Sequence, residues 1–203
     1  MRRLARGDRL VVATHNAGKL EEIAALLEPF GVEAASAAAL GLPEPAETEE
    51  TFAGNARIKA HAAARATGLP ALADDSGLCV DALGGAPGVR TADWAETPGG
   101  RDFLQAMTRT WDALEAARAP EPRAAQFRCT LVLARPDGTD AVFEGAMPGR
   151  VVWPPRGTRG HGYDPIFQPD GFDATFAEMD RWAKNRISHR GRAFAAFVAG
   201  ALG

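Results

Sequence analysis

The sequence predicts a mixed α/β fold in a single unit of 203 residues. It opens with an apolar run, a tight polar loop and a helical pattern, an order that is typical of α/β proteins. A later stretch alternates apolar and polar residues on both sides of a turn signal, which indicates a long antiparallel hairpin. No internal repeat interrupts the chain, so we expect one domain over residues 1–203.

The first quarter of the chain favours one strand and one helix. Residues 9–16, RLVVATHN, form an apolar run that is typical of a buried strand. Residues 17–31 carry apolar side chains at helical spacing, and Gly31 marks the end of that helix. Residues 41–50, GLPEPAETEE, are rich in proline and acids and predict a loop.

An alanine-rich helix is expected over residues 51–68, TFAGNARIKAHAAARATG. Thr48 is its expected N-cap and Gly68 its end, with glutamates near the positive end of the helix dipole. Phe52, Asn55 and Lys59 fall on one face, so an amide and a cation share the side of core-type residues. Lys59 either extends to solvent or pairs with a carboxylate; the nearby acids favour a ligand site.

Residues 72–81, LADDSGLCVD, place two acids between apolar runs. An ionised carboxylate is costly to bury without a partner, so Asp74 and Asp75 must meet solvent, a cation or hydrogen-bond donors. Ser76 and Gly77 predict a sharp turn at the tip of this strand-like segment. The segment therefore predicts a functional site.

The second half predicts a helix, a hairpin and a final helix. Residues 101–118 place Phe103, Met107, Trp111 and Leu114 on one helical face, after glycines 99 and 100. Residues 124–153 alternate and turn at positions 136–138, Pro-Asp-Gly. A glycine-rich loop follows over 154–167, and residues 183–202 favour a single helix.

Composition excludes several classes of protein. The hydrophobic fraction of 46% and the net charge of −3 give no reason to expect a nucleic-acid or anionic-membrane surface. No apolar run approaches the roughly 20 residues that span a bilayer, and the run after the N-terminal arginines is too short for a signal peptide. We expect a cytoplasmic protein in which Cys79 and Cys129 are buried, reduced thiols.

Two further groups of residues suggest ligand contacts. Residues 14–19, THNAGK, lie between a strand and a helix, where backbone N–H groups, Asn16 and Lys19 could bind an anion. This stretch lacks the first glycine and the final hydroxyl of a Walker A loop. In the C-terminal region, cationic and planar side chains gather in regions that could close over a nucleotide: His161, Tyr163, Asp164, Lys184, His189 and Arg190.

These motifs together resemble the inosine triphosphate pyrophosphatase family. THNAGK, TFAGNARIKA, LADDSGLCVDALGGAPGVRTA, GHGYDPIF and ISHRG follow in this order over about residues 9–195. The resemblance implies an α/β fold with a long mixed central sheet, flanking helices and two lobes around a deep nucleotide cleft. It also implies a homodimer and Mg²⁺-dependent hydrolysis of ITP, dITP and XTP to the monophosphate and pyrophosphate, a hydrolase activity that cleanses the nucleotide pool.

The resemblance assigns roles to individual residues. Asp75 matches the catalytic acid and a Mg²⁺ ligand, and Glu47 matches the second ligand, with Glu49 and Glu50 as alternatives. The substrate contacts that we expect are Thr14, His15, Asn16, Ala17, Gly18, Lys19, Asn55, Lys59, Ser76, His161, Gly162, Tyr163, Asp164, Lys184, His189 and Arg190. Water would attack the α-phosphorus with help from Asp75, and His189 and Arg190 would read the 6-keto group of the purine.

Two departures from the family pattern and three rival interpretations accompany this assignment. His161 stands where the family most often has phenylalanine, and Trp182-Ala183 replaces an acidic pair. A binding module without turnover would not need Asp75. A haloacid-dehalogenase-type phosphatase needs a D-x-D-x-[TV] motif after its first strand, which is missing here. A pyrophosphatase for modified pyrimidines is disfavoured by the SHR and GYDPIF motifs.

Overall fold

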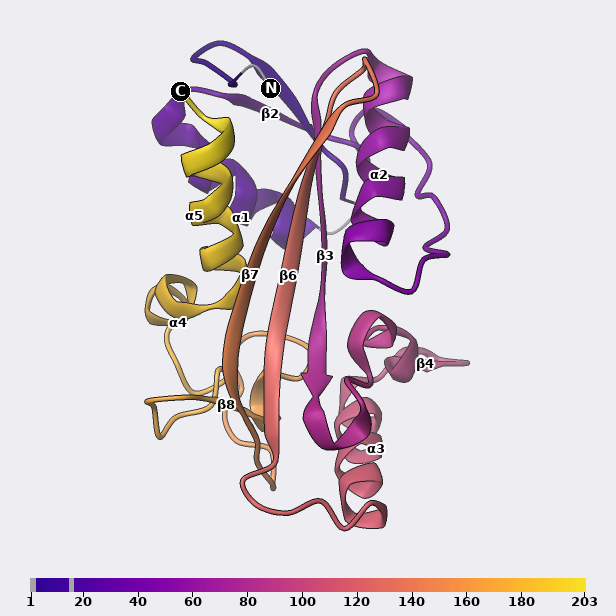
Figure 1. Cartoon of the computed structure of the whole chain (residues 1–203), viewed down its shortest axis with the longest axis vertical. Coiled ribbons are helices and arrows are strands. Elements are labelled where there is room, and N and C mark those ends of the chain that lie inside the picture. Colours follow the sequence, from indigo (N-terminus) through magenta and orange to yellow (C-terminus); the bar gives the residue numbers. More distant parts are fainter. Residues whose placement is uncertain (1–2, 15–16) are drawn as a thin grey trace. The chain divides into compact units, whose positions relative to one another are not determined.

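A computed structural model describes residues 3–14 and 17–203 of the chain (Figure 1). Its helices are α1 (Ala17–Leu27), α2 (Phe52–Thr67), α3 (Phe103–Ala116), α4 (Arg181–Ile187) and α5 (His189–Ala201). Its strands are β1 (Arg9–Val12), β2 (Glu33–Ser36), β3 (Ala71–Val80), β4 (Glu96–Thr97), β5 (Gly100–Arg101), β6 (Ala124–Ala134), β7 (Asp140–Val151) and β8 (Phe167–Pro169). No helix in this described part combines the length and apolar character needed to cross a membrane.

The described strands form a mixed sheet, which confirms the predicted fold class. Six of them are hydrogen-bonded in the order β2-β1-β3-β6-β7-β8, while β4 and β5 form a separate small pair. Strand β1 is parallel to both β2 and β3, and β7 is antiparallel to β8. The turn between β6 and β7 lies at residues 135–139, so the predicted hairpin is also confirmed.

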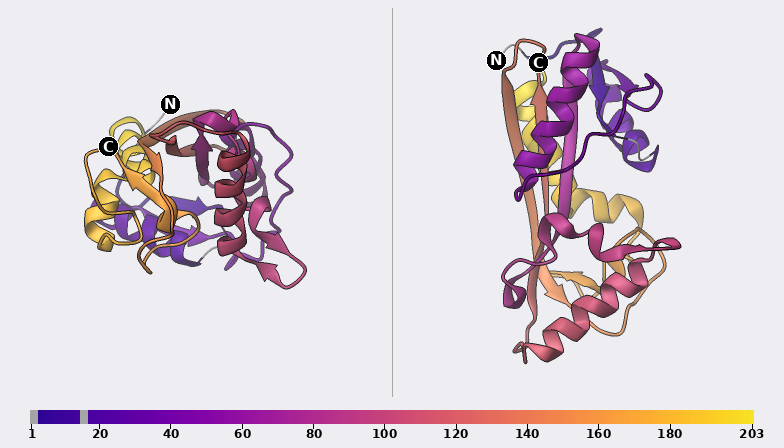
Figure 2. Two further views of the ribbon diagram at one scale, coloured as in Figure 1. Left: turned by 90° about the horizontal axis from the view of Figure 1, so that it is seen from below. Right: turned by 90° about the vertical axis from the view of Figure 1, so that its right-hand side faces the viewer.

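The chain divides into two compact units, each with its own core. The first comprises Met1–Asp75, Thr130–Glu144 and Ala193–Gly203, and the second comprises Ser76–Cys129 and Gly145–Arg192. Within the first unit, α2 and α5 lie on opposite sides of the strands (Figures 1 and 2). The single domain and the deep nucleotide cleft, which the sequence predicts, both stay predictions.

The core of the first unit fixes which way the side chains of β3 point. Ala71 and Ala73 pack with the alanines of α2, including Ala60. Successive side chains of a strand point to opposite faces, so Asp75 shares the α2 face with these two alanines. Asp74 consequently points to the other face of the sheet.

The core of the second unit contains the predicted face of α3. Met107 and Leu114 are buried, while Phe103 and Trp111 are partly buried and pack against the same core. The helix begins after Asp102, whose carboxylate accepts hydrogen bonds from the N–H groups of Leu104 and Gln105. An aspartate thus caps this helix, and the two preceding glycines belong to the β4–β5 hairpin.

The predicted turn at Ser76-Gly77 is wrong. Strand β3 continues from Ala71 to Val80, with Leu78 and Val80 fully buried in the core of the second unit. Those apolar side chains favour continued extension, and the burial that they gain outweighs the local turn preference of serine and glycine. Asp74 and Asp75 therefore lie inside a strand.

The single C-terminal helix that the sequence predicts over residues 183–202 is divided into two helices. Helix α4 ends at Ile187 and α5 begins at His189, because Ser188 adopts an extended backbone with ψ 158°. The Oγ of Ser188 accepts a hydrogen bond from the N–H of Gly191 at 3.1 Å. Serine is a preferred N-cap residue, and this one caps the new helix directly before His189 and Arg190.

The N-cap of α2 is Thr51, whereas the sequence pattern favoured Thr48. The Oγ1 of Thr51 accepts a hydrogen bond from the N–H of Gly54 at 3.0 Å, and the opposite end closes on Gly68 in a left-handed conformation. A capping side chain must reach the N–H two or three residues ahead, and only Thr51 has that position relative to the first helical residue.

Thr51→Ala is therefore expected to lower the free energy of unfolding by about 1 kcal/mol, the typical value of one N-cap. Thr48→Ala removes an equally exposed hydroxyl from the same segment and is expected to change it by less than about 0.5 kcal/mol. Urea denaturation of both variants measures the difference. Equal losses in the two variants would contradict the assignment of Thr51 as the cap.

Candidate active site

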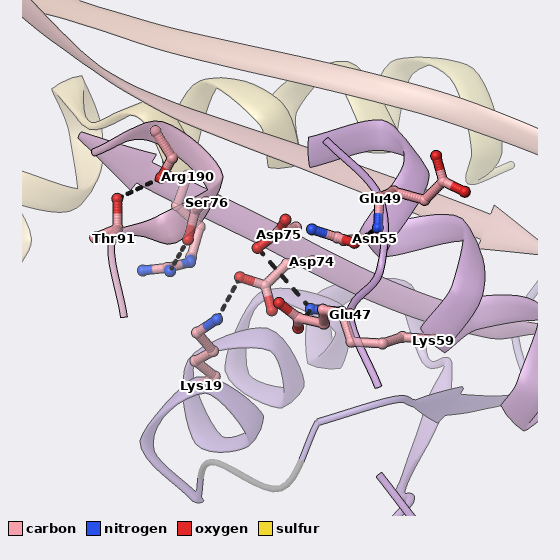
Figure 3. A network of polar contacts seen from close by, with 11 residues as sticks. Lys19, Glu47, Glu49, Asn55, Lys59, Asp74, Asp75, Ser76, Thr91 and Arg190 are labelled. Carbon is pink, nitrogen blue, oxygen red and sulfur yellow. Dashed lines mark hydrogen bonds and ion pairs between the residues drawn. The ribbon is translucent and has the colours of Figure 1, made fainter. Parts of the chain in front are cut away.

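Two neighbouring acids in β3 are each paired with a lysine from a different helix (Figure 3). The Nζ of Lys19 in α1 lies 2.8 Å from the Oδ2 of Asp74, whose side chain is only 2% exposed. The Nζ of Lys59 in α2 lies 4.0 Å from the Oδ1 of Asp75. The alternation of the strand sends one carboxylate to each face, so both acids meet a cation without a turn in the backbone.

Glu47 joins the cluster on the Asp75 face. Its Oε1 lies 2.6 Å from the Nζ of Lys59, so the buried ammonium contacts carboxylates from two separate segments. Glu47 precedes α2, Lys59 lies in its second turn, and Asp75 comes from β3. The three side chains that the sequence analysis links to metal and phosphate are therefore brought together in one place.

Asp75 is poised to exchange a proton near neutral pH. Burial raises the pKa of its carboxyl, the neighbouring carboxylates of Glu47 and Asp74 also raise it, and Lys59 and a hydrogen bond from Asn55 lower it, so that the pKa is about 6. Asp75 as a whole is only 7% exposed. A general base works best when its pKa lies near the working pH, so this carboxylate has the properties that proton abstraction from water requires.

Lys59 stays protonated in this setting. Burial alone would lower the pKa of its ammonium, but the charges of Asp74, Asp75 and Glu47 outweigh burial and raise it. The side chain is 10% exposed. A buried cation with a raised pKa keeps its full charge over the physiological range, which is what binding of an anionic ligand needs.

Asn55 links the acidic segment before α2 to the strand. It is 2% exposed, its Oδ1 accepts a hydrogen bond from the N–H of Glu49 at 2.9 Å, and its amide faces Asp75 (Figure 3). The carboxylate of Glu49 points away from the cluster in the same view, whereas that of Glu47 points into it. The geometry thus favours Glu47 over Glu49 as the second acid of the site.

The donor set fits a small divalent cation. Carboxylate oxygens are the ligands that Mg²⁺ prefers, and Mg²⁺ is usually bound through one or two of them together with water and phosphate oxygens. The ammonium of Lys59 already lies against the carboxylates of Glu47 and Asp75, so this position is favourable for positive charge. Across residues 3–14 and 17–203, no three His, Cys, Asp or Glu side chains gather closely enough to hold a metal by themselves.

The second unit contains the predicted glycine-rich loop residues. Asp164 is 2% exposed; its Oδ2 accepts hydrogen bonds from the N–H of His161 at 2.9 Å and from Lys184 at 2.5 Å. The tight approach requires Gly160, because a Cβ there would lie 2.0 Å from that oxygen. Asp164 therefore connects the loop to α4.

Tyr163 supports this loop from inside the core. Its side chain is 1% exposed, its hydroxyl donates to the carbonyl of Thr91 at 3.2 Å, and its ring meets Phe103 edge to face. Burial raises the pKa of the hydroxyl to about 12, so it remains a donor. The ring anchors the loop, and Gly162 next to it adopts a left-handed φ of 68°.

The SHR motif places its side chains around a short aromatic stack. His189 is 6% exposed, and its ring stacks on Phe127 with centroids 4.8 Å apart and on Phe176 at 6.4 Å. The Nη2 of Arg190 donates to the Oγ of Ser76 at 3.4 Å. The stack fixes the plane of the imidazole, and the hydroxyl of Ser76 orients the guanidinium.

The predicted residues thus form one cluster in the first unit and one set in the second. Lys19, Asn55, Lys59, Asp75 and Glu47 belong to the first, and Ser76, His161, Gly162, Tyr163, Asp164, Lys184, His189 and Arg190 to the second. Thr14 precedes α1, which begins with Ala17 and Gly18. His15 and Asn16 lie outside the described residues.

Four residues of these groups were not assigned a role from the sequence. Asp74 is the partner of Lys19, Thr91 accepts the hydrogen bond of Tyr163, and Phe127 and Phe176 hold His189. Strand alternation through residues 71–80 was the signal that could have separated Asp74 from Asp75. Phe127 and Phe176 are far from His189 in sequence, and an apolar residue in a strand or loop gives no signal of such a contact.

Gly160→Ala is expected to lower the free energy of unfolding by more than its backbone strain alone, about 1 kcal/mol or more. Gly171→Ala is the matched control, since Gly171 has a similar left-handed φ of 83° but no atom within 4 Å of the added Cβ. Chemical denaturation of both variants isolates the contact with Asp164. Equal losses in the two variants would show that Asp164 does not lie against Gly160.

Comparisons with known proteins agree with this architecture. The model of the Ham1 family matches residues 10–200. A protein from Ruegeria pomeroyi named dITP/XTP pyrophosphatase is 70% identical over 203 residues, which cover 100% of both chains. The structure of a HAM1 protein from Coxiella burnetii has a TM-score of 0.89 and 38% identity, covering 95% of this chain and 97% of that one.

A second solved structure extends the comparison. The nucleoside-triphosphatase, or dITP/XTP pyrophosphatase, from Mycobacterium abscessus has a TM-score of 0.76 and 40% identity, covering 94% of this chain and 98% of that one. The match extends along nearly the whole chain in each of these comparisons. Together with the motifs and the mixed sheet, they establish that the chain belongs to the Ham1 family.

Proposed function

We propose that this chain hydrolyses non-canonical purine nucleoside triphosphates, dITP, XTP and ITP, to the monophosphate and pyrophosphate. The names of its relatives from Ruegeria pomeroyi and Mycobacterium abscessus support the substrate class. The observation that carries the proposal is Asp75, a buried carboxylate with a pKa of about 6 on a face shared with Lys59 and Glu47. This cluster combines a base with charges suited to a phosphate chain.

We assign the triphosphate to the cluster of the first unit. Lys59 and Lys19 each offer an amine that is already paired with a carboxylate, and α1 begins at Ala17, so its N-terminus offers backbone N–H groups. A triphosphate that arrives would compete with Glu47 and Asp74 for these amines. We propose that Glu47 and Asp75 hold Mg²⁺, which when bound neutralises charge on the phosphate oxygens.

Asp75 is the proposed base of the reaction. Its carboxylate orients a water molecule and accepts a proton from it as the water oxygen attacks the α-phosphorus in line with the bridging oxygen. The bond between the α-phosphorus and the bridging oxygen breaks, and pyrophosphate leaves with that oxygen. Lys59 and Lys19 stabilise the charge that develops on the leaving group, so positioning and electrostatics provide most of the acceleration.

We propose that the predicted contact residues of the second unit, chiefly His189 and Arg190, select the purine base. Hypoxanthine and xanthine present a 6-keto acceptor where adenine presents an amino donor. The guanidinium of Arg190 and the imidazole of His189 are held by Ser76 and by the aromatic stack, so they offer donors in a fixed geometry. An adenine in this position would leave polar groups unpaired, at a cost of about 1–3 kcal/mol for each buried contact.

The test is a panel of substrates with Mg²⁺ and the purified chain. Separate incubations with dITP, XTP, GTP, ATP and dTTP are resolved for nucleotide products and assayed for pyrophosphate and orthophosphate. We expect monophosphate and pyrophosphate from dITP and XTP at rates far above those for ATP and dTTP. Release of orthophosphate from dITP, or fastest turnover of dTTP, would contradict the proposal.

Two properties implied by the family resemblance belong to the same proposal. We propose that the chain acts as a homodimer and that it works in the cytoplasm on the free nucleotide pool. Sedimentation equilibrium of the purified chain tests the first of these. A single species with the mass of one chain at micromolar concentration would contradict it.

A further inference from the structure

A short acidic segment contacts α2 through several separate interactions. We call residues 43–50 the acidic strap; it contains Glu44, Glu47, Glu49 and Glu50 and has no regular secondary structure. The backbone N–H of Glu49 donates to the Oδ1 of Asn55 at 2.9 Å, and the carboxylate of Glu47 accepts from Lys59 at 2.6 Å. Asn55 and Lys59 are four residues apart, so both contacts come from one face of the helix.

Gly54 adds an independent contact between the same partners. A Cβ at Gly54 would lie 2.5 Å from the Cβ and 2.7 Å from the Cγ of Glu49. Real Cβ atoms do not approach other carbon atoms this closely, so the side chain of Glu49 lies in space that only glycine leaves open. The first turn of α2 thus contacts both the backbone and the side chain of Glu49.

Asn55 is placed to connect the strap with the proposed base. It is almost completely buried, its oxygen accepts a hydrogen bond from the N–H of Glu49, and its amide faces Asp75. Figure 3 shows Asn55 between Glu49 and Asp75, and the carboxylate of Glu47 beside the amine of Lys59. Because Glu47 is only two residues from Glu49, fixing the N–H of Glu49 limits where the Glu47 carboxylate can lie relative to Asp75.

We infer that Asn55 is a positioning residue, which holds the acidic strap so that Glu47 and Asp75 face the same position. This inference rests on the proposed function, and it replaces direct substrate contact as the role of Asn55. An outer hydrogen-bond partner of a ligating carboxylate typically changes metal affinity by about tenfold to a hundredfold when it is removed. Replacing Asn55 should therefore mainly raise the Mg²⁺ concentration that is needed for half-maximal turnover.

The test compares Asn55→Ala and Gly54→Ala with Thr51→Ala. Asn55→Ala removes the hydrogen bond to the strap, and Gly54→Ala forces away Glu49, and also the Oγ1 of Thr51 at 2.9 Å, while leaving Asn55 in place. Thr51→Ala removes the cap of the same helix turn without touching Glu49, so it controls for simple loss of stability. Hydrogen–deuterium exchange of peptides within residues 43–50 reports on the strap, and the Mg²⁺ concentration for half-maximal turnover of dITP reports on the site.

We expect faster exchange of the strap in Asn55→Ala and Gly54→Ala, and a Mg²⁺ requirement raised about tenfold or more, with a smaller change in kcat at saturating Mg²⁺. Thr51→Ala should leave the Mg²⁺ requirement unchanged. If Asn55→Ala does not fold, Gly54→Ala alone decides.

Two results would overturn the inference. One is unchanged exchange in both strap variants; the other is a loss of kcat in Asn55→Ala with an unchanged Mg²⁺ requirement, which would mean that Asn55 acts on the substrate. If the wild-type chain turns over no dITP, the proposed function fails. The exchange comparison then decides the inference by itself, since it needs no substrate.

Discussion

Replacing Asp75 with asparagine is expected to lower kcat for dITP by about a hundredfold to ten-thousandfold, the usual contribution of a general base. The amide has the same shape but cannot accept the proton of the attacking water. Asp74→Asn is the matched control, because it makes the same chemical change one residue away, on the opposite face of β3. We expect a much smaller loss of kcat, since Asp74 is paired with Lys19 and acts on the proposed base only through its charge.

The same substitution should stabilise the metal-free protein. Because burial raises the pKa of Asp75 from 3.8 to about 6, the folded state binds its proton more tightly than the unfolded state. The resulting stability is present below the unfolded pKa and is lost as pH rises through the folded pKa. This loss amounts to about 3 kcal/mol above pH 6.

Urea denaturation with a chelator present should therefore show Asp75→Asn to be more stable than wild type at pH 8, by up to about 3 kcal/mol. The difference should shrink towards zero well below the unfolded pKa of 3.8, where both states of the wild-type carboxyl are largely protonated. Lower stability of the variant at pH 8, together with unchanged kcat, would show that Asp75 is not part of the active site. Stability gained while activity is lost is the expected sign of a functional buried charge.

Lys59→Met is expected to lower kcat/KM about a hundredfold or more, the typical cost of one preorganised charge or donor at a reacting centre. Methionine fills nearly the same space as the aliphatic part of the lysine side chain, so the substitution mainly removes the charge. Lys59 lowers the pKa of Asp75, and without it the acid limb of the pH profile of kcat/KM should move to higher pH.

Lys59→Arg is the control for this variant, since it keeps a positive charge on α2. We expect its acid limb to lie close to that of wild type, with activity between those of wild type and Lys59→Met. Measured profiles from pH 5 to pH 9 in constant Mg²⁺ give both comparisons. An acid limb in Lys59→Met that coincides with wild type would contradict electrostatic coupling between Lys59 and Asp75.

Much of the fold follows from local pattern. The helical face of α3, the hairpin of β6 and β7, and the glycine end of α2 at Gly68 were all predicted, because periodicity and turn chemistry act over a few residues. The helix predicted over residues 17–31 instead ends at Leu27, and Gly31 closes a short 3-10 turn over residues 28–30. The largest error occurs where distant burial decides. β3 continues through Ser76-Gly77 because Leu78 and Val80 enter a core built from residues far along the chain.

The candidate site was likewise predicted in part. Residue types and spacing pointed to Asp75, Lys59 and Glu47, and the structure brings these three together. The choice among Glu47, Glu49 and Glu50 could not come from spacing, since the strap has no regular periodicity. The packing of Glu49 on Gly54 favours Glu47, because it turns the carboxylate of Glu49 away.

The central claim is that Asp75 directs water to the α-phosphorus of a nucleoside triphosphate. Hydrolysis of dITP by the wild-type chain in ¹⁸O-labelled water, with mass spectrometry of both products, tests it most directly. We predict one labelled oxygen in the monophosphate and none in pyrophosphate. Label in pyrophosphate or in orthophosphate would place the attack on another phosphorus and contradict this mechanism.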